Sequence, residues 1–279
     1  MNFLLIFFLI LSQVAICQTD MPKPYSVKGR FYLYWGYNRA FFTQSDIHID
    51  GPRYNFWIYD VEATDRPTQI NKGSDFLTYI KPSSFTIPQY NYRLGFHFTE
   101  RFSLSVGLDH LKYVMKKGQN LLVSGTISEE ASARYQGLYE NKRMDITEDF
   151  FKFEHTNGLN YLSVEAEYSY PFWRLKNNKL IANIIGGAGG GWAIPKTDVK
   201  VFGEGLDNDF HIAGYGLSGK IGLRLDFLKH FFIAGDLKCG YFRLPAVLIA
   251  NNPIDLAHHN FGFLEYYFVA GVRFKVFGK

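Results

Sequence analysis

Residues 90–114 contain two long stretches in which apolar and polar side chains alternate. On the first, Tyr90, Tyr92, Leu94, Phe96 and Phe98 fall on one face of an extended chain; on the second, Phe102, Leu104, Val106 and Leu108 do. A period of two predicts two β-strands, joined here by a tight turn at 99–101. The opposite faces carry Arg93, His97 and Asp109. A long apolar face ending in aromatic residues, backed by a charged face, is typical of strands with lipid outside and a polar interior.

The same alternation recurs along the chain and predicts eight strands. They cover 29–42, 86–99, 102–115, 158–170, 180–193, 210–227, 231–244 and 261–277. Short turns at 99–101, about 174–179 and 228–230 alternate with long connections at 43–84, 116–155, 195–209 and 245–259. The pattern predicts an all-β, antiparallel transmembrane β-barrel of eight strands, with short periplasmic turns and long extracellular loops. Ten strands is the alternative, if 52–62 and part of 74–88 also cross the membrane.

The N-terminus predicts export. Residues 3–11 form an apolar segment followed by Ala15-Ile16-Cys17, which suits a signal peptide at 1–17 and a barrel domain at 18–279, although the first residues carry no Lys or Arg. Only Cys239 would remain, which excludes an intrachain disulfide. A mean hydropathy of −0.12 despite 19 Tyr and 27 Phe fits alternating strands. These features predict a bacterial outer-membrane location, and the scattered net charge of +4 does not favour nucleic-acid binding.

The polar faces of the predicted strands carry nearly balanced charges. We expect the following residues to form a network in the lumen: Arg93, His97, Asp109, Glu165, Glu167, Lys220, Arg224, Asp226, Asp236, Lys238, Glu265 and Arg273. Arg30 and Lys275 also fall on the polar faces of their predicted strands. An eight-stranded barrel is just wide enough for its side chains to fill it, and buried charges require partners. The sequence therefore predicts a paired network that plugs the barrel, rather than a wide pore or a catalytic site.

Two further patterns in the sequence suggest weaker sites. Asp46, His48 and Asp50 lie at alternate positions, so an extended segment would place three donors for a divalent cation on one face; solvent exposure is the simpler interpretation. The glycine run at 186–191 lacks the spacing and the following helix of a nucleotide loop. Glycines in such a strand more often admit large neighbours. We therefore expect no cofactor.

An enzymatic alternative rests on His155-Thr156-Asn157-Gly158 with Glu165 downstream. This segment is similar to the His-x-Ser-Asn motif, with its downstream Glu, of the lipid A 3-O-deacylases, which are small outer-membrane barrels. Asn157 stands where that family has its serine nucleophile, and an amide cannot act as one. By parity, His155, Asn157 and Glu165 would share the lumen face, whereas an enzyme acting on lipid A needs its site toward the bilayer.

Most of the mature chain resembles an uncharacterised family of outer-membrane barrels of Bacteroidota. The resemblance is carried by SDIHIDGPRYNFWIYDVEATDRP at 45–67, TIPQYNYRLGFHF at 86–98, GLDHLKYVM at 107–115, EHTNGLNYLSVE at 154–165 and FHIAGYGLSGKIGLRLDF at 210–227. It implies a barrel and its location but no reaction. We expect a monomer with a structural or interaction role, contacting outer-membrane lipid, lipopolysaccharide and an envelope protein. A lipid-modifying enzyme and a channel or binder for small apolar ligands are the alternatives.

Overall fold

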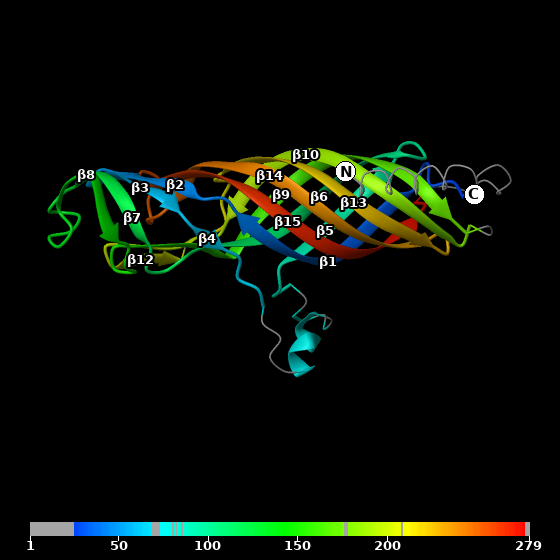
Figure 1. The fold of residues 1–279 in the computed structure, drawn as a ribbon, viewed down its shortest axis with the longest axis horizontal. Helices are drawn as coiled ribbons and strands as arrows, with labels where there is room; N and C mark the ends of the chain where they lie inside the picture. The colour runs from blue at the N-terminus through cyan, green and yellow to red at the C-terminus, as the bar shows by residue number, and fades with distance from the viewer. Residues whose placement is uncertain are drawn as a thin grey trace, which may run out of the picture.

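Eight antiparallel strands close into a ring. The computed structural model describes residues 25–276 except 69–72, 80, 82, 85, 176–177 and 208, so the expected signal peptide lies outside the described residues. The ring contains β1 (Phe31–Phe42), β5 (Tyr90–His97), β6 (Phe102–Met115), β9 (Phe151–Arg174), β10 (Leu180–Pro195), β13 (Gly214–Phe227), β14 (Phe231–Leu248) and β15 (Leu256–Phe274). Each strand pairs with the next in this order, and β15 pairs with β1 to close it (Figure 1). The predicted all-β antiparallel fold with eight strands is confirmed at this level.

Side chains alternate strictly between the inside and the outside of the ring. On β15, Glu265 and Tyr267 are buried, whereas the intervening Tyr266 and the following Phe268 are exposed, Phe268 to 71%. The same alternation follows β1, where Tyr32 and Tyr34 point inward and Leu33 points outward. Outward side chains are therefore apolar and inward ones polar or aromatic, which is the reverse of a water-soluble sheet.

Smaller strands extend one end of the ring. β2 (Ser45–Gly51) continues from β15 to β3 (Tyr54–Val61), β7 (Asn120–Ile127) and β8 (Gly137–Asp145), while β11 (Asp198–Val201) pairs with β9 and with β12 (Glu204–Asp207). Two-residue β4 (Ala63–Thr64) pairs with β6. We call these strands, together with the ends of β6, β9, β14 and β15 beside them, the distal section. Figure 1 shows it at the end of the molecule opposite the end of β15.

The distal section has a hydrophobic core of its own. Fully buried Phe56, Phe150 and Phe153 pack there with Ile47 and Ile58. The sequence analysis treats 43–84 and 116–155 as loops, with only the strand-like part of 43–84 extending a hairpin. The strand-like part is confirmed as β3, which forms a hairpin with β2 beyond the ring, but a loop is wrong for much of 116–155, because β7 and β8 occupy it and β9 begins at Phe151. Of the charged residues of 116–155, Glu140, Lys142, Arg143 and Asp145 lie on exposed positions of β8, and others such as Glu129 and Glu148 lie in turns.

Several predicted boundaries also differ. β9 runs on to Arg174, past the predicted strand end at 170, and β14 and β15 extend beyond the predicted ends toward the distal section. Lys275 follows the end of β15 and is exposed, so it does not belong to the interior. The ten-stranded alternative is wrong, because β3 pairs with β2 and β7 outside the ring. The described residues of 74–88 include the 3₁₀-helix η1 (Gly73–Tyr79) and no strand.

The segment around η1 forms an arm that projects sideways from the ring (Figure 1). It is anchored where the Tyr37 hydroxyl donates to the Tyr79 carbonyl and the Lys112 ammonium donates to the Ile87 carbonyl. Within the described part of the chain, no helix has the length and apolar character needed to cross a membrane.

Glycines in β10 leave space for the charged interior. A Cβ at Gly189 would lie 2.5 Å from Cγ of Glu165, and one at Gly187 would lie 3.3 Å from Cε of Lys220. Across the ring, a Cβ at Gly107 would lie 2.8 Å from the side chain of Arg93. The glycines therefore leave room for the long side chains of Glu165, Lys220 and Arg93, which supports the expectation that the glycine run admits large neighbours.

Candidate functional site

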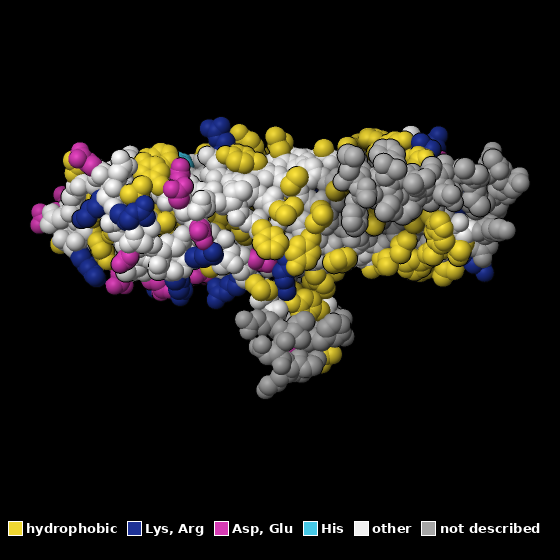
Figure 2. All heavy atoms as spheres, viewed as in Figure 1, with side chains coloured by type: hydrophobic (Ala, Val, Ile, Leu, Met, Phe, Trp, Pro, Cys, Tyr) yellow, Lys and Arg dark blue, Asp and Glu magenta, His cyan; other side chains and the backbone are white. Residues whose placement is uncertain are grey.

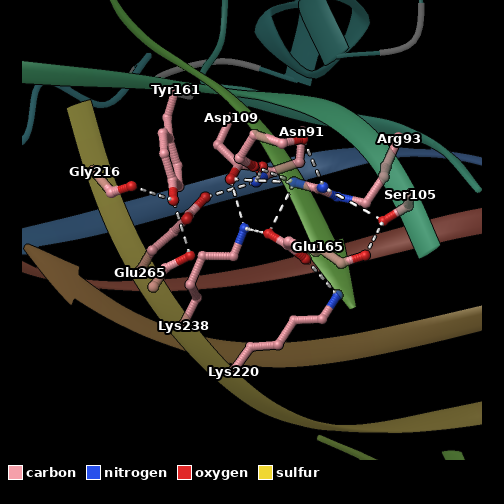
Figure 3. Close-up of polar contacts among 12 residues, drawn as sticks. Asn91, Arg93, Ser105, Asp109, Tyr161, Glu165, Gly216, Lys220, Lys238 and Glu265 are labelled. Atoms are coloured by element: carbon pink, nitrogen blue, oxygen red, sulfur yellow. Dashed lines mark hydrogen bonds and ion pairs between the residues drawn. The ribbon is translucent and has the colours of Figure 1, made fainter. Parts of the chain in front are cut away.

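Glu165 on β9 is the centre of an ion-pair network inside the ring (Figure 3). Its Oε1 lies 2.9 Å from Nη2 of Arg93 and 2.6 Å from Nζ of Lys238, and its Oε2 lies 3.0 Å from Nζ of Lys220. The four residues come from β9, β5, β14 and β13, so they tie four of the eight strands together. All four side chains are at most 2% exposed, so the cluster is shielded from bulk solvent.

Asp109 on β6 extends the network away from Glu165. Lys238 Nζ lies 2.5 Å from its Oδ2, and Arg93 Nη2 lies 3.6 Å from the same oxygen. The Asn91 amide donates to both Asp109 and Glu265, at 2.7 Å each (Figure 3). Glu265 itself forms no ion pair within 4.0 Å of a described residue. Two carboxylates are thus bridged by one neutral amide, whose two N–H groups are both used.

A second group of charges lies further along the same interior. Lys220 joins the two groups, because its ammonium is also 3.0 Å from Oε2 of Glu167. Arg224 contacts Oε1 of Glu167 and Oδ1 of Asp226, each at 3.1 Å. Arg273 closes the series with Nη2 at 2.5 Å from the same Asp226 oxygen. Charges of alternating sign therefore follow one another along the interior.

All twelve residues expected in the lumen are buried inside the ring, and ten of them are described above. His97 is held by an aromatic contact with Tyr32, with 5.0 Å between ring centroids, and forms no ion pair with a described residue. Asp236 is buried on β14 and likewise has no ion pair within 4.0 Å among the described residues. Arg30 is buried too, its guanidinium donating to the Ser26 carbonyl.

The sequence analysis missed the neutral partners of these charges. Arg93 donates to the Tyr34 hydroxyl at 3.2 Å and to the Ser163 hydroxyl at 3.0 Å. Both residues occupy inward-facing positions of their strands. The alternation of the sequence therefore indicated that they face the interior. Hydrogen bonds of this kind complete the solvation of a guanidinium that carboxylates alone do not satisfy.

The residues of the enzymatic alternative do not converge. His155 is buried in the distal section, whereas Asn157 is exposed and its amide donates to Asp207 at 3.2 Å. The expected common face is therefore wrong, because β6 and β9 shift register at Leu111–Tyr113 and Gly158 has φ of 133°. Glu165 lies ten residues from His155 along one strand, or about 33 Å. This geometry excludes a triad of His155, Asn157 and Glu165.

Asp46, His48 and Asp50 share one face of β2 but have other partners. Asp46 accepts from the Asp60 backbone at 2.9 Å, and Asn55 bonds both His48 and Asp50. The His48 ring stacks on Trp57, with 4.3 Å between centroids and an angle of 9°. Among the described residues no group of three His, Cys, Asp or Glu side chains could hold a metal ion.

A buried histidine pair in the distal section was not predicted. His155 Nδ1 lies 3.0 Å from the Thr197 hydroxyl, and its Nε2 lies 3.4 Å from Nε2 of His259. Both histidines are in the aromatic core beside Phe153 and Tyr113. Burial lowers the pKa of His259 to about 3 and places the pKa of His155 well below its ordinary 6.5. The pair is therefore neutral at physiological pH, one imidazole donating to the other.

Comparison with known proteins gives similarities to solved structures only. Neither a protein-family model nor a curated protein sequence matches the chain. It is similar to the attachment invasion locus protein Ail of Yersinia pestis (12% identity, 88% of this chain and 99% of that one, TM-score 0.32). It is also similar to the outer membrane protein OprG of Pseudomonas aeruginosa (8%, 90% and 98%, TM-score 0.36) and to Neisserial surface protein A (10%, 89% and 99%, TM-score 0.34). All three TM-scores lie below 0.5.

Proposed function

We propose that this protein is an outer-membrane β-barrel whose ring crosses the bilayer with a sealed interior, and whose distal section stands outside the cell as an interaction module. The observation that carries the proposal is the apolar outer surface of the ring. Exposed apolar residues there include Leu33, Leu94, Leu104, Val106, Val164, Ile184, Leu217, Ile221, Leu223, Ile233, Leu237, Leu264, Phe268 and Val272. Water-soluble monomers rarely expose a continuous apolar surface of this extent.

Aromatic residues border this surface at both ends. Near the short turns the exposed ones are Phe98, Phe102, Tyr170, Trp173, Phe231 and Phe274; toward the distal section they are Tyr92, Trp192, Tyr215, Tyr241 and Tyr266. On β14 the two rims are ten residues apart, from Phe231 to Tyr241. Ten residues span about 33 Å of strand, or about 25 Å of height at a tilt of about 40°, the height of the apolar band in transmembrane barrels.

The distal section differs from the ring on its outer surface. Figure 2 shows charged side chains gathered over it, while hydrophobic ones cover much of the visible ring. Its core makes it a rigid platform rather than a set of loops. A polar, stably folded extension beyond a membrane ring suits contact with an envelope or extracellular partner, and the ring can anchor it as a monomer.

The charged interior supports a sealed barrel. Arg93 and Lys238 are fully buried and Glu165 is 1% exposed, so water does not pass them. We therefore expect purified protein in planar bilayers to give no conductance above a protein-free control. Steady channels of uniform size would refute the seal while leaving the membrane location intact.

Fractionation and gel migration test the location. The folded protein is expected in the outer-membrane fraction and should migrate differently before and after boiling. An epitope inserted between β7 and β8 should be accessible to antibody on intact cells, whereas one inserted in the turn between β13 and β14 should not. A soluble periplasmic protein with a single gel mobility would overturn the proposal. Crosslinking of intact envelopes would then identify a partner of the distal section.

A further inference from the structure

Two strands of the ring present the same order of side chains on their outer faces. Along β1 the outward residues run Leu33, Trp35, Tyr37 and Arg39 toward the distal section, followed by exposed Phe41. Along β6 they run Val106, Leu108, His110 and Lys112. Apolar, then aromatic, then cationic side chains follow one another in each case. That order matches the passage from hydrocarbon through the interface to the charged headgroups of a bilayer.

The aromatic level forms a continuous wall across β1, β5 and β6. Trp35 stacks on Tyr92 and on Tyr90, with interplanar angles of 3° and 14°. Tyr90 in turn stacks on His110, with 4.8 Å between centroids and an angle of 6°. Stacking fixes these rings at the boundary of the apolar surface, so the cations beyond them are held at a defined height.

Above the wall stand three cations, Arg39, Lys112 and Arg66, which have few hydrogen-bond partners among the described residues. The charges of Arg39, Arg66 and Asp65 all act on the ammonium group of Lys112. Arg39 donates one described hydrogen bond, to the Asn38 carbonyl, and Lys112 donates one, to the Ile87 carbonyl. Arg66 pairs with Glu154 through Nη1 and has a side chain that is 61% exposed.

Nearby carboxylates offset only part of this positive charge. Asp65 accepts hydrogen bonds from the backbones of Ala40 and Arg66, and Glu154 is shared between Arg66 and Lys152. Guanidinium and ammonium groups with free N–H donors beside an aromatic rim are suited to phosphate oxygens. On the opposite side of the ring, exposed Arg243 of β14 lies just beyond Tyr241 of the rim but lacks the stacked wall.

We propose that Arg39, Lys112 and Arg66 bind the phosphorylated headgroup of an outer-leaflet glycolipid whose acyl chains lie against β1, β5 and β6. This inference rests on the membrane location proposed above. Arg39 and Lys112 stand on strands separated by β5, which places them about 10 Å apart across the sheet. That separation suits a headgroup with phosphates at both ends of a disaccharide, as in diphosphorylated lipid A, better than a single phosphodiester.

Native mass spectrometry of the detergent-purified full chain tests the proposal, using diphosphorylated lipid A and the same lipid with both phosphates removed. Wild-type protein should bind the phosphorylated form preferentially. Arg39→Gln with Lys112→Gln should lose this preference, by about tenfold in affinity for each cation removed. Arg243→Gln is the matched control, since it removes one exposed cation beyond the same rim and should leave the preference unchanged. Phosphatidylglycerol and inorganic pyrophosphate serve as competitors.

The outcomes separate the two proposals. Equal binding of both lipids by wild type, or an undiminished preference in the double variant, would overturn the glycolipid site even if the protein is a membrane barrel. Displacement by pyrophosphate at equal concentration would show an anion site without a lipid, and full competition by phosphatidylglycerol would show a general attraction to anionic lipid; either result also overturns it. Absence from the membrane fraction would instead refute the location.

Discussion

Replacing Glu165 by Gln should destabilise the ring far more than the same replacement at Glu265. Both residues are buried inside the ring, and both changes replace a carboxyl group by a neutral amide of the same size. Glu165 lies within 3.0 Å of three cations, whereas Glu265 has no ion pair with a described residue and accepts a hydrogen bond from Asn91. A glutamine at 265 can accept that bond unchanged, while a glutamine at 165 leaves excess positive charge in a site without water.

The magnitude follows from the remaining partners. Breaking a buried ion pair costs about 3–5 kcal/mol, because an uncompensated charge is left behind. Each cation around Glu165 keeps one other carboxylate, namely Asp109 for Arg93 and Lys238 and Glu167 for Lys220. We therefore expect Glu165→Gln to lower the free energy of unfolding by about 3 kcal/mol, the lower end of that range. Glu265→Gln, which retains its hydrogen bond, should change the free energy of unfolding by about 1 kcal/mol or less.

Urea titrations of the protein folded in detergent micelles, followed by tryptophan fluorescence, measure both changes. Adding Lys220→Gln to Glu165→Gln restores the charge balance and should recover part of the loss. Equal destabilisation by the two single variants would show that total interior charge, and not local pairing, governs stability. Additive losses in the double variant would contradict direct coupling between Glu165 and Lys220.

Three further predictions concern the distal section and the glycine run. Because folding lowers the pKa of His155 and His259, the unfolded chain binds more protons below pH 6.5, so the distal section should lose stability as pH falls through that value, by about 2 kcal/mol per histidine at pH 5; smaller amide-exchange protection factors in β2 and β3 at pH 5 than at pH 7.5, each taken relative to the unstructured chain at the same pH and unchanged in a His155→Gln, His259→Gln variant, check this. Phe153→Ala should cost the distal core about 3–5 kcal/mol and expose it to protease, while the ring keeps its heat-modifiable migration; resistance equal to wild type would contradict a separately packed core. Gly189→Val should lower the folded yield because its side chain would meet that of the central glutamate, whereas Ala188→Val, which adds its methyl groups on the exposed face of the same strand, should not; similar yields would refute the close approach.

The sequence predicted the ring well because alternation is a local signal. Each of the eight predicted strands overlaps a strand of the ring, and 102–115 coincides with β6. The distal section escaped this reasoning because its segments are short and their exposed faces are densely charged, as in β8 with Glu140, Lys142 and Arg143. Their strand character depends on burying residues such as Val123 and Tyr139 in a shared core, which is a tertiary effect that a local pattern does not contain.

The failure at His155 and Asn157 has a different cause. Parity counted back from Glu165 puts both on the inner face, but the positive φ at Gly158 and the register shift opposite it move Asn157 to the outer surface. The interruption lies where β9 passes from the ring into the distal section. There the inward side chains change from charged, as at Glu165, to aromatic, as at Phe153.

The two parts of the molecule are therefore held together by different forces along the same strands. In the ring, the apolar surface points outward, and ion pairs fill the interior together with a smaller buried cluster that includes Tyr32, Phe232 and Tyr267. In the distal section, the apolar residues point inward as in a water-soluble sheet. Transfer from lipid to water should accordingly expose the outer surface of the ring and leave the distal core intact. A conformational signal from a bound partner would then travel along β9 and β15 and through Tyr161, Phe242 and Phe263, which continue the distal core into the ring.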